Sequence, residues 1–280
     1  MSGIMEQLLG CVEKMPAFPQ SVHKILQLTA DADCSAKDIV RTIECDPIMT
    51  VKVLKVINSA FYGLPQKITS IQRASVHLGL NTIKNLALSI AAIGMLGNTE
   101  KAGLKADDFL LHSLSTALLG KRLAARLGCS AEDGSDIYIA GLLHDFGKVV
   151  FAEFFPDRFR QALQMARQED ISLHLAELRV IGIDHAQAGR LLVEKWQLPE
   201  DLSAAIALHH DPQPGGLLRD CVFAANQISK TLHLGDAGNA RIEPLPPAIA
   251  ERFGLPLQEL IAALGDLSRI EAEANAFILL

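Results

Sequence analysis

The stretch GLLHDFGKVV, residues 141–150, places three ionisable side chains inside an otherwise apolar segment. They are His144, Asp145 and Lys148, an imidazole, a carboxylate and an ammonium group. Charged side chains at helical spacing often serve only to keep a helix soluble. Histidine and aspartate are also side chains that bind metal ions, so the stretch raises a metal site as the second hypothesis.

The chain around this stretch predicts an all-α protein. Of its 280 residues, 49% are hydrophobic and only 5% are aromatic. A chain of this length buries roughly 75% of its unfolded surface, enough for one large domain or two small ones. Nearly every segment carries apolar residues at helical spacing, and none alternates as a half-buried strand does.

The order of the predicted helices divides the chain into three parts. We expect an N-terminal helical lobe over residues 1–100, a second helical lobe over 101–235, and a Pro-rich linker with a C-terminal helix over 236–280. Asp46-Pro47 predicts an N-cap followed by proline, and Asn81 is expected to cap a helix over residues 82–96. Further helices are predicted over residues 105–127, 136–155, 157–169, 172–182, 184–197, 199–210, 216–233 and 256–278. The last of these is amphipathic, and we expect it to pack on the body of the protein or, failing that, on a second copy.

Charge and cysteine content exclude several classes of protein. The net charge of −6 gives no strong signal for nucleic-acid binding, which needs a clustered basic surface. The five cysteines are widely spaced and form no C-x-x-C pair, which favours a reducing cytosol. The longest uncharged run has 15 residues, fewer than the roughly 20 that cross a bilayer, and the N-terminus lacks the pattern of a signal peptide. We therefore expect a cytoplasmic protein.

A series of histidines gives the His-Asp pair its weight. A single His-Asp pair is weak evidence, since a second one occurs at residues 210–211. Five histidines, however, recur at helix-sized intervals in the second lobe: His112, His144, His185, His209 and His210. Neutral imidazoles on converging helices bind Fe, Mn, Ni or Zn, and Asp145 could bridge two ions. Small residues near His144 and His185, among them Gly141, Gly147 and Gly189, would let the helices approach closely.

Lys148 lies three residues after Asp145 and one turn after His144. We weigh two roles equally: contact with a substrate phosphate, or an ion pair with Asp145. Outside the series, His23, His77, His174 and His233 are expected to be structural or solvated.

Longer segments resemble a known family. They are MPAFPQSVHKILQL (15–28), DPIMTVKVLKVINSAFYG (46–63), ITSIQRASVHLGLNTIKNLAL (68–88) and AGLLHDFGK (140–148). With segments further along, they closely resemble the HDOD family, the HD-related output domain of bacterial signalling proteins, over roughly residues 8–233. This family is related to the HD superfamily of metal-dependent phosphohydrolases. The resemblance implies an HD-domain-like helical bundle of two packed lobes in a bacterial protein.

The resemblance also implies roles for individual residues. His112 matches the first metal-binding histidine, His144 and Asp145 the HD pair, and Lys148 the lysine that follows it. His185, His209 and His210 match additional histidines of the HD-GYP cyclic-di-nucleotide phosphodiesterases. Asn226 stands where the enzymes have their last aspartate, which should weaken metal affinity and water activation because its carbonyl is neutral. The Gly-Tyr-Pro loop is missing after His185, so we do not expect hydrolysis of cyclic-di-GMP by the HD-GYP route.

We therefore expect a regulatory protein for signal transduction with a degenerate HD-type metal site. It would act by binding a signalling protein or a small phosphorylated ligand, and the sequence leaves a homodimer open. The alternative is a metal-dependent phosphohydrolase or phosphodiesterase that uses a metal-activated water. A purely structural helical scaffold, in which the histidines never bind metal, is the third hypothesis.

Overall fold

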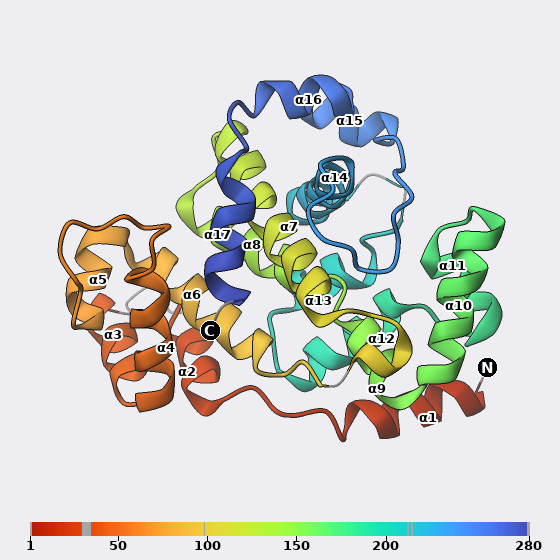
Figure 1. Cartoon of the computed structure of the whole chain (residues 1–280), viewed down its shortest axis with the longest axis horizontal. Coiled ribbons are helices and arrows are strands. Elements are labelled where there is room, and N and C mark those ends of the chain that lie inside the picture. Colours follow the sequence, from red (N-terminus) through yellow and green to blue (C-terminus); the bar gives the residue numbers. More distant parts are fainter. Residues whose placement is uncertain (1, 30–34, 98, 212, 214, 279–280) are drawn as a thin grey trace.

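The protein is built from helices throughout the part that the structure describes. The structure is a computed structural model, and it describes residues 2–29, 35–97, 99–211, 213 and 215–278. Within these ranges the chain forms helices α1 to α17 and one 3-10 turn, with no strand (Figure 1). The predicted all-α class is confirmed.

The N-terminal helices, except the first, form a small bundle at one end of the molecule (Figure 1). Their bounds are α1 Ser2–Val12, α2 Gln20–Thr29, α3 Ala36–Glu44, α4 Pro47–Ile57, α5 Ile71–Leu78 and α6 Leu80–Ile93. Helix α1 stands apart from the other five and packs on α9 and α12 instead. Asp46 caps α4 as predicted, because its Oδ1 accepts a hydrogen bond from the Met49 amide at 3.0 Å.

The predicted Asn81 cap is wrong. Helix α6 begins at Leu80, and Gly79 is the N-cap with a φ of 79°. Glycine accepts this positive φ, and here α5 and α6 meet at an angle of 120°.

No single helix in the described ranges is long and apolar enough to cross a membrane, and α5 and α6 pass that test only when they are counted together.

The second group of helices surrounds a core of α7, α8 and α14, which pack on one another. The bounds are 3-10 turn Thr99–Ala102, α7 Ala106–Arg126, α8 Ala131–Leu143, α9 Gly147–Phe154, α10 Pro156–Glu169, α11 Leu173–Val180, α12 His185–Lys195, α13 Glu200–Ala207 and α14 Leu217–Thr231. Ser135 and Ser89 bind the N-terminal bundle to this core. Ser135 donates to Asn85 on α6 at 2.7 Å, and Ser89 on α6 lies 2.9 Å from the Tyr138 hydroxyl. The division between residues 1–100 and 101–235 stays a prediction.

Two predicted helices of this group are shorter than expected. The single helix over residues 136–155 is wrong: α8 ends at Leu143, and α9 starts at Gly147. The helix predicted over residues 199–210 ends at Ala207, so His209 and His210 lie beyond it. The metal-ligand candidates therefore sit largely at helix ends and turns rather than along helix faces.

Close helix crossings explain the glycines around the break. A Cβ on Gly147 would lie 1.9 Å from the carbonyl oxygen of His185 and 2.6 Å from the amide nitrogen of Gly189. A Cβ on Gly141 would lie 2.9 Å from the Cα of Ala117 on α7. Only glycine fits at these contacts, so the expectation that small residues allow close approach is confirmed.

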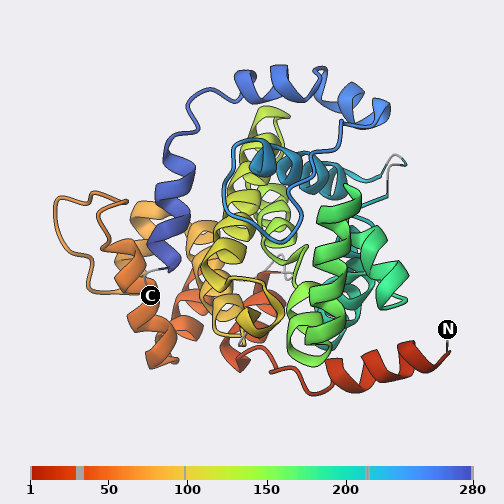
Figure 2. The same cartoon turned by 45° about the vertical axis from the view of Figure 1, so that its right-hand side comes forward.

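The C-terminal segment wraps around the body. Its helices are α15 Pro247–Phe253, α16 Leu257–Ala263 and α17 Arg269–Ile278, so the single helix predicted over residues 256–278 is wrong. The chain breaks at Gly265, whose φ is 74°. Figures 1 and 2 show the segment passing over α14 and then running beside α7 to the N-terminal bundle. Packing on the body of the protein, as predicted, is confirmed.

Candidate metal centre

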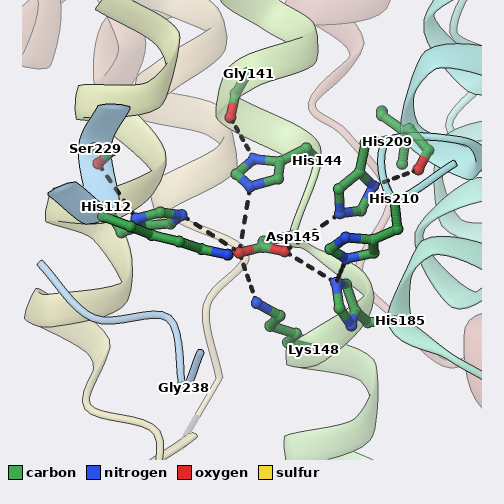
Figure 3. A network of polar contacts seen from close by, with 12 residues as sticks. His112, Gly141, His144, Asp145, Lys148, His185, His209, His210, Ser229 and Gly238 are labelled. Atoms are coloured by element: carbon green, nitrogen blue, oxygen red, sulfur yellow. Dashed lines mark hydrogen bonds and ion pairs between the residues drawn. The ribbon is translucent and has the colours of Figure 1, made fainter. Parts of the chain in front are cut away.

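The structure brings the predicted cluster together around Asp145 (Figure 3). His112 comes from α7, His144 and Asp145 from the turn between α8 and α9, His185 from the start of α12, and His209 and His210 from the turn after α13. The side chains of His112, His144, Asp145, His185 and His209 are at most 2% exposed. Helices that are far apart in the sequence thus deliver five imidazoles to one buried carboxylate.

The two oxygens of Asp145 face two separate groups of histidines. Oδ2 lies 3.6 Å from Nε2 of His112 and 3.3 Å from Nε2 of His144. Oδ1 lies 3.1 Å from Nε2 of His185 and 3.7 Å from Nε2 of His209. Nε2 of His210 completes the second group, 2.8 Å from Nε2 of His185. In each group the ligand atoms lie within 4.8 Å of one another, so each could hold a metal ion.

The hydrogen bonds of the imidazoles determine which ring nitrogen is bare. Nδ1 of His144 lies 2.7 Å from the Gly141 carbonyl oxygen, and Nδ1 of His209 lies 2.7 Å from that of Ile206. Nδ1 of His185 lies 2.5 Å from the Glu177 carboxylate. Carbonyl and carboxylate oxygens only accept, so each Nδ1 carries the proton. In the neutral rings of His144 and His209, Nε2 then presents a lone pair to Asp145.

His112 follows the same pattern through a hydroxyl group. Ser229 donates to the Leu234 carbonyl oxygen at 3.3 Å, and its own oxygen lies 3.3 Å from Nδ1 of His112. A proton on Nδ1 satisfies this contact and leaves Nε2 of His112 bare as well.

These bare atoms are the observation that tests the site for a metal. Among the described residues, Nε2 of His112, His144 and His209 and Oδ1 of Asp145 have no hydrogen-bond partner. A buried polar atom without a partner costs about 1–3 kcal/mol. Lone pairs that face a carboxylate repel it, whereas a cation between them would satisfy both. The donor set of imidazole nitrogens and carboxylate oxygens therefore fits a divalent transition metal.

Charge in the cluster is concentrated on Asp145. Burial opposes the ionisation of Asp145, but the Lys148 ammonium beside it favours the carboxylate, and the pKa of Asp145 lies well below its usual range. Lys148 donates to Oδ2 at 2.7 Å, so the ion pair, one of the two roles weighed for Lys148, is present. Burial lowers the pKa of His209 to about 3, which keeps its ring neutral and ready to bind a metal.

Three side chains beside the cluster were missed at the level of sequence. Glu177 is fully buried and accepts from both the backbone amide and Nδ1 of His185, at 2.8 Å and 2.5 Å. The ring of His174, expected to be structural or solvated, stacks on His210 with centroids 4.2 Å apart. Burial lowers the pKa of Lys230 to about 8. His174 and Glu177 lie one turn apart on α11, and an acid on the buried face of that helix was the available signal.

Asn226 lies on α14, one turn before Ser229. Its side chain is buried, and its Oδ1 has no hydrogen-bond partner among the described residues. Its correspondence to the last aspartate of the HD enzymes stays a prediction.

Comparison with known proteins identifies the family. The sequence matches the HDOD domain over residues 15–212. The chain belongs to the HDOD family. This HDOD chain is 26% identical over 271 residues to an uncharacterized protein of Treponema pallidum. The match covers 95% of this chain but only 51% of the relative. The chain thus spans about half the length of that curated relative.

Solved structures share the HDOD fold. One is an HDOD domain protein with unknown function from Geobacter sulfurreducens, with 24% identity, 99% and 100% of the two chains covered and a TM-score of 0.78. Another, from Marinobacter aquaeolei, is named provisionally as a signal transduction protein. The two sequences are 22% identical, and the structures superimpose with a TM-score of 0.80. The match covers 99% of this chain and 66% of the Marinobacter chain. At this identity the likeness shows the fold alone.

Proposed function

We propose that this HDOD protein is a regulatory module that holds divalent transition metal at the Asp145 cluster and acts by binding a partner. The observation that carries the proposal is the convergence of bare Nε2 atoms of His112, His144 and His209 on Asp145, all four side chains being at most 2% exposed. A metal bound there would join α7, the α8–α9 turn, α12 and the end of α13. Its presence would fix the arrangement of these elements.

Two features favour holding a metal over turning over a substrate. A catalytic metal keeps a coordination position open to water or substrate. The side chains of Asp145 and Lys148 are only 2% exposed, and Lys148 is engaged with Asp145. The neutral amide of Asn226 also supplies less charge than an aspartate would.

Metal content tests the proposal. Protein purified without a chelator or a metal-affinity tag should contain Fe, Mn, Ni or Zn at one equivalent or more by elemental analysis. His144→Ala should lose at least one equivalent, because it removes a bare Nε2 beside Asp145. His77→Ala, at an exposed position on α5, is the matched control and should keep the metal. Sub-stoichiometric metal that His144→Ala leaves unchanged would refute the metal centre.

The second candidate is a metal-dependent phosphohydrolase or phosphodiesterase. It is favoured by one observation, the sharing of a single carboxylate by two groups of ligands beside the ammonium of Lys148. A bound metal would supply a Lewis acid and a metal-activated water at neutral pH. Lys148 would exchange its ion pair with Asp145 for contact with a substrate phosphate.

Substitution at position 226 separates the two candidates. If the protein is an enzyme, the wild type should hydrolyse members of a panel of phosphomonoesters and cyclic nucleotides, Asn226→Asp should be faster, and His144→Ala inactive. The added carboxylate would supply the anion that the enzymes use. Absence of turnover by both the metal-loaded wild type and Asn226→Asp would exclude hydrolysis of these substrates and leave the regulatory role.

A further inference from the structure

A groove of about 490 Å³ lies on the second lobe, and none of the metal ligands named above lines it. It is formed by the first turns of α8, the exposed face of α13 and the start of α14. Its wall is largely apolar, and Leu208 within it is 44% exposed. The apolar residues that line it are Ile137, Pro199, Leu202, Ala204, Ala205, Leu208, Leu217 and Leu218.

The charges that line the groove are predominantly negative. Asp133, Asp136 and Asp201 lie in its wall. Asp136 forms an ion pair with Lys84 at 3.7 Å, whereas Asp133 and Asp201 form no ion pair with any residue in the described ranges. Arg219 is the one cation among the lining residues, and it is only 8% exposed.

Arg219 does not offset the acidic side chains at the mouth. It lies 3.7 Å from Asp211 and 3.9 Å from Asp220, and Asp220 also pairs with Arg252 at 2.7 Å. Two carboxylates therefore already balance the charges of these two arginines. The groove therefore combines an apolar floor with unbalanced negative charge. Cationic, apolar ligands complement such a surface in both respects.

The helices that form the groove also carry the metal centre. Leu208 directly precedes His209, and the Ile206 carbonyl on α13 accepts the hydrogen bond that orients the His209 ring. Helix α8 ends just before His144, and α14 carries Ser229, which contacts His112. A ligand that displaces α13 relative to α8 and α14 would move ligands on both sides of Asp145.

We propose that this groove docks a basic amphipathic helix of a partner protein. The apolar stripe of such a helix would lie on Leu208, Leu217 and Leu218, which are at least partly exposed. Its lysine or arginine side chains would face Asp133 and Asp201. This inference names the class of partner for the proposed regulatory function. Docking itself requires no metal, whereas its effect on the metal centre rests on that function.

Binding of a synthetic helix tests the docking. The probe is a fluorescent, side-chain-stapled helix of leucine and lysine, and its anionic counterpart carries glutamate in place of lysine. Anisotropy titrations of the metal-free protein should give saturable binding of the cationic helix that weakens as salt is raised, and at least tenfold weaker binding of the anionic helix.

Three variants locate the binding. Ala204→Trp fills the groove from an exposed position on α13, and Asp201→Lys reverses a charge in its wall. Both should weaken binding about tenfold or more. Glu259→Lys makes a matched charge change in the first turn of α16 and should change binding less than twofold. Circular dichroism identifies any variant that fails to fold, and the Asp201/Glu259 comparison remains decisive if Ala204→Trp does.

Hydrogen exchange and metal affinity complete the test. The bound helix should slow amide hydrogen exchange in α13 and at the start of α14. A saturating concentration of the helix should change the metal dissociation constant of the wild type at least threefold, but should leave that of Asp201→Lys unchanged. Equal binding by wild type and Asp201→Lys, or protection elsewhere, would overturn the docking. Self-association that Ala204→Trp abolishes would also overturn it, because a second copy would then occupy the groove. Docking by a protein that takes up no metal in elemental analysis would support this inference while contradicting the proposed metal centre.

Discussion

A buried glutamate orients the histidine that lies nearest to Asp145. Nε2 of His185 is 3.1 Å from Oδ1 of Asp145, and Glu177 holds the opposite side of the ring through Nδ1. Burial lowers the pKa of His185, but the charge and hydrogen bond of Glu177 and the hydrogen bond with Asp145 together raise this pKa above its ordinary value. A carboxylate behind a metal-binding histidine fixes the ring and increases the basicity of its other nitrogen.

The charge of Glu177 should therefore be visible in metal affinity. We expect Glu177→Gln to weaken binding of the metal roughly 10- to 100-fold while the fold is kept, because the amide retains the size of the side chain but not its charge. Competition with a chelating dye gives the affinity. Glu169→Gln, which alters an exposed ion pair with Arg179, is the control and should match the wild type. Equal affinity of all three proteins would remove Glu177 from the metal centre.

Sequence could predict the histidines of the cluster but not their supports. The ligand candidates stood out because His112, His144 and His185 recur at helix-sized intervals. Glu177 belongs to no such series. Its one signal is an acid on the buried face of a short helix, and its role exists only once α11 packs on α12. Protonation of Nδ1 in His144 and His209 likewise depends on the positions of backbone carbonyl groups. Those positions follow from where the helices end, and residue patterns do not define them.

At the scale of elements, the break between α8 and α9 places the His-Asp pair in a turn. The apolar spacing of residues 136–155 continues through the break, so periodicity alone predicted one helix. The α-helix prediction was right for both halves, and the turn escaped it because its cause is a distant element: α12 crosses at Gly147. The same limit applies to His209 and His210, which follow the end of α13 rather than lie on it.

Gly147 should be among the least replaceable residues of the chain. Gly147→Ala would place a Cβ 1.9 Å from the His185 carbonyl oxygen, and relief requires movement of backbone. We expect a loss of about 2–3 kcal/mol in the free energy of unfolding, measured with urea. Gly10→Ala on α1, where nothing lies within 4 Å of the new Cβ, should instead be neutral or add up to about 1 kcal/mol. Similar effects at the two glycines would contradict the close crossing.

At the scale of the whole molecule, the buried histidines make stability depend on pH. Burial lowers the pKa of His209 to about 3 and shifts the pKa values of His112 and His210 downward as well. In the unfolded chain these groups titrate near 6.5. Below that pH the unfolded chain takes up protons that the folded protein does not, so stability falls as the pH falls. His185, whose pKa is raised, opposes this trend.

Metal-free protein should therefore be less stable at pH 5 than at pH 7. One histidine of this kind costs about 2 kcal/mol over that interval, and we expect a net loss of at least this size in urea unfolding. His209→Asn should flatten the dependence by about 1.4 kcal/mol per pH unit between pH 6 and 4. A wild-type stability that is constant from pH 7 to pH 5 would show that the histidines are not buried in neutral form.

The position of α17 has a consequence for the synthesis of the chain. Arg269 stacks over the Phe61 ring at 5.0 Å and donates to the Phe61 carbonyl oxygen, and α17 packs on α6 and α7. The two residues are 208 positions apart. At about 5–20 residues per second, a ribosome needs roughly 10–40 s to make the intervening chain. During that time the N-terminal bundle is fully translated but lacks its cover, so the nascent chain exposes apolar surface that chaperones can bind.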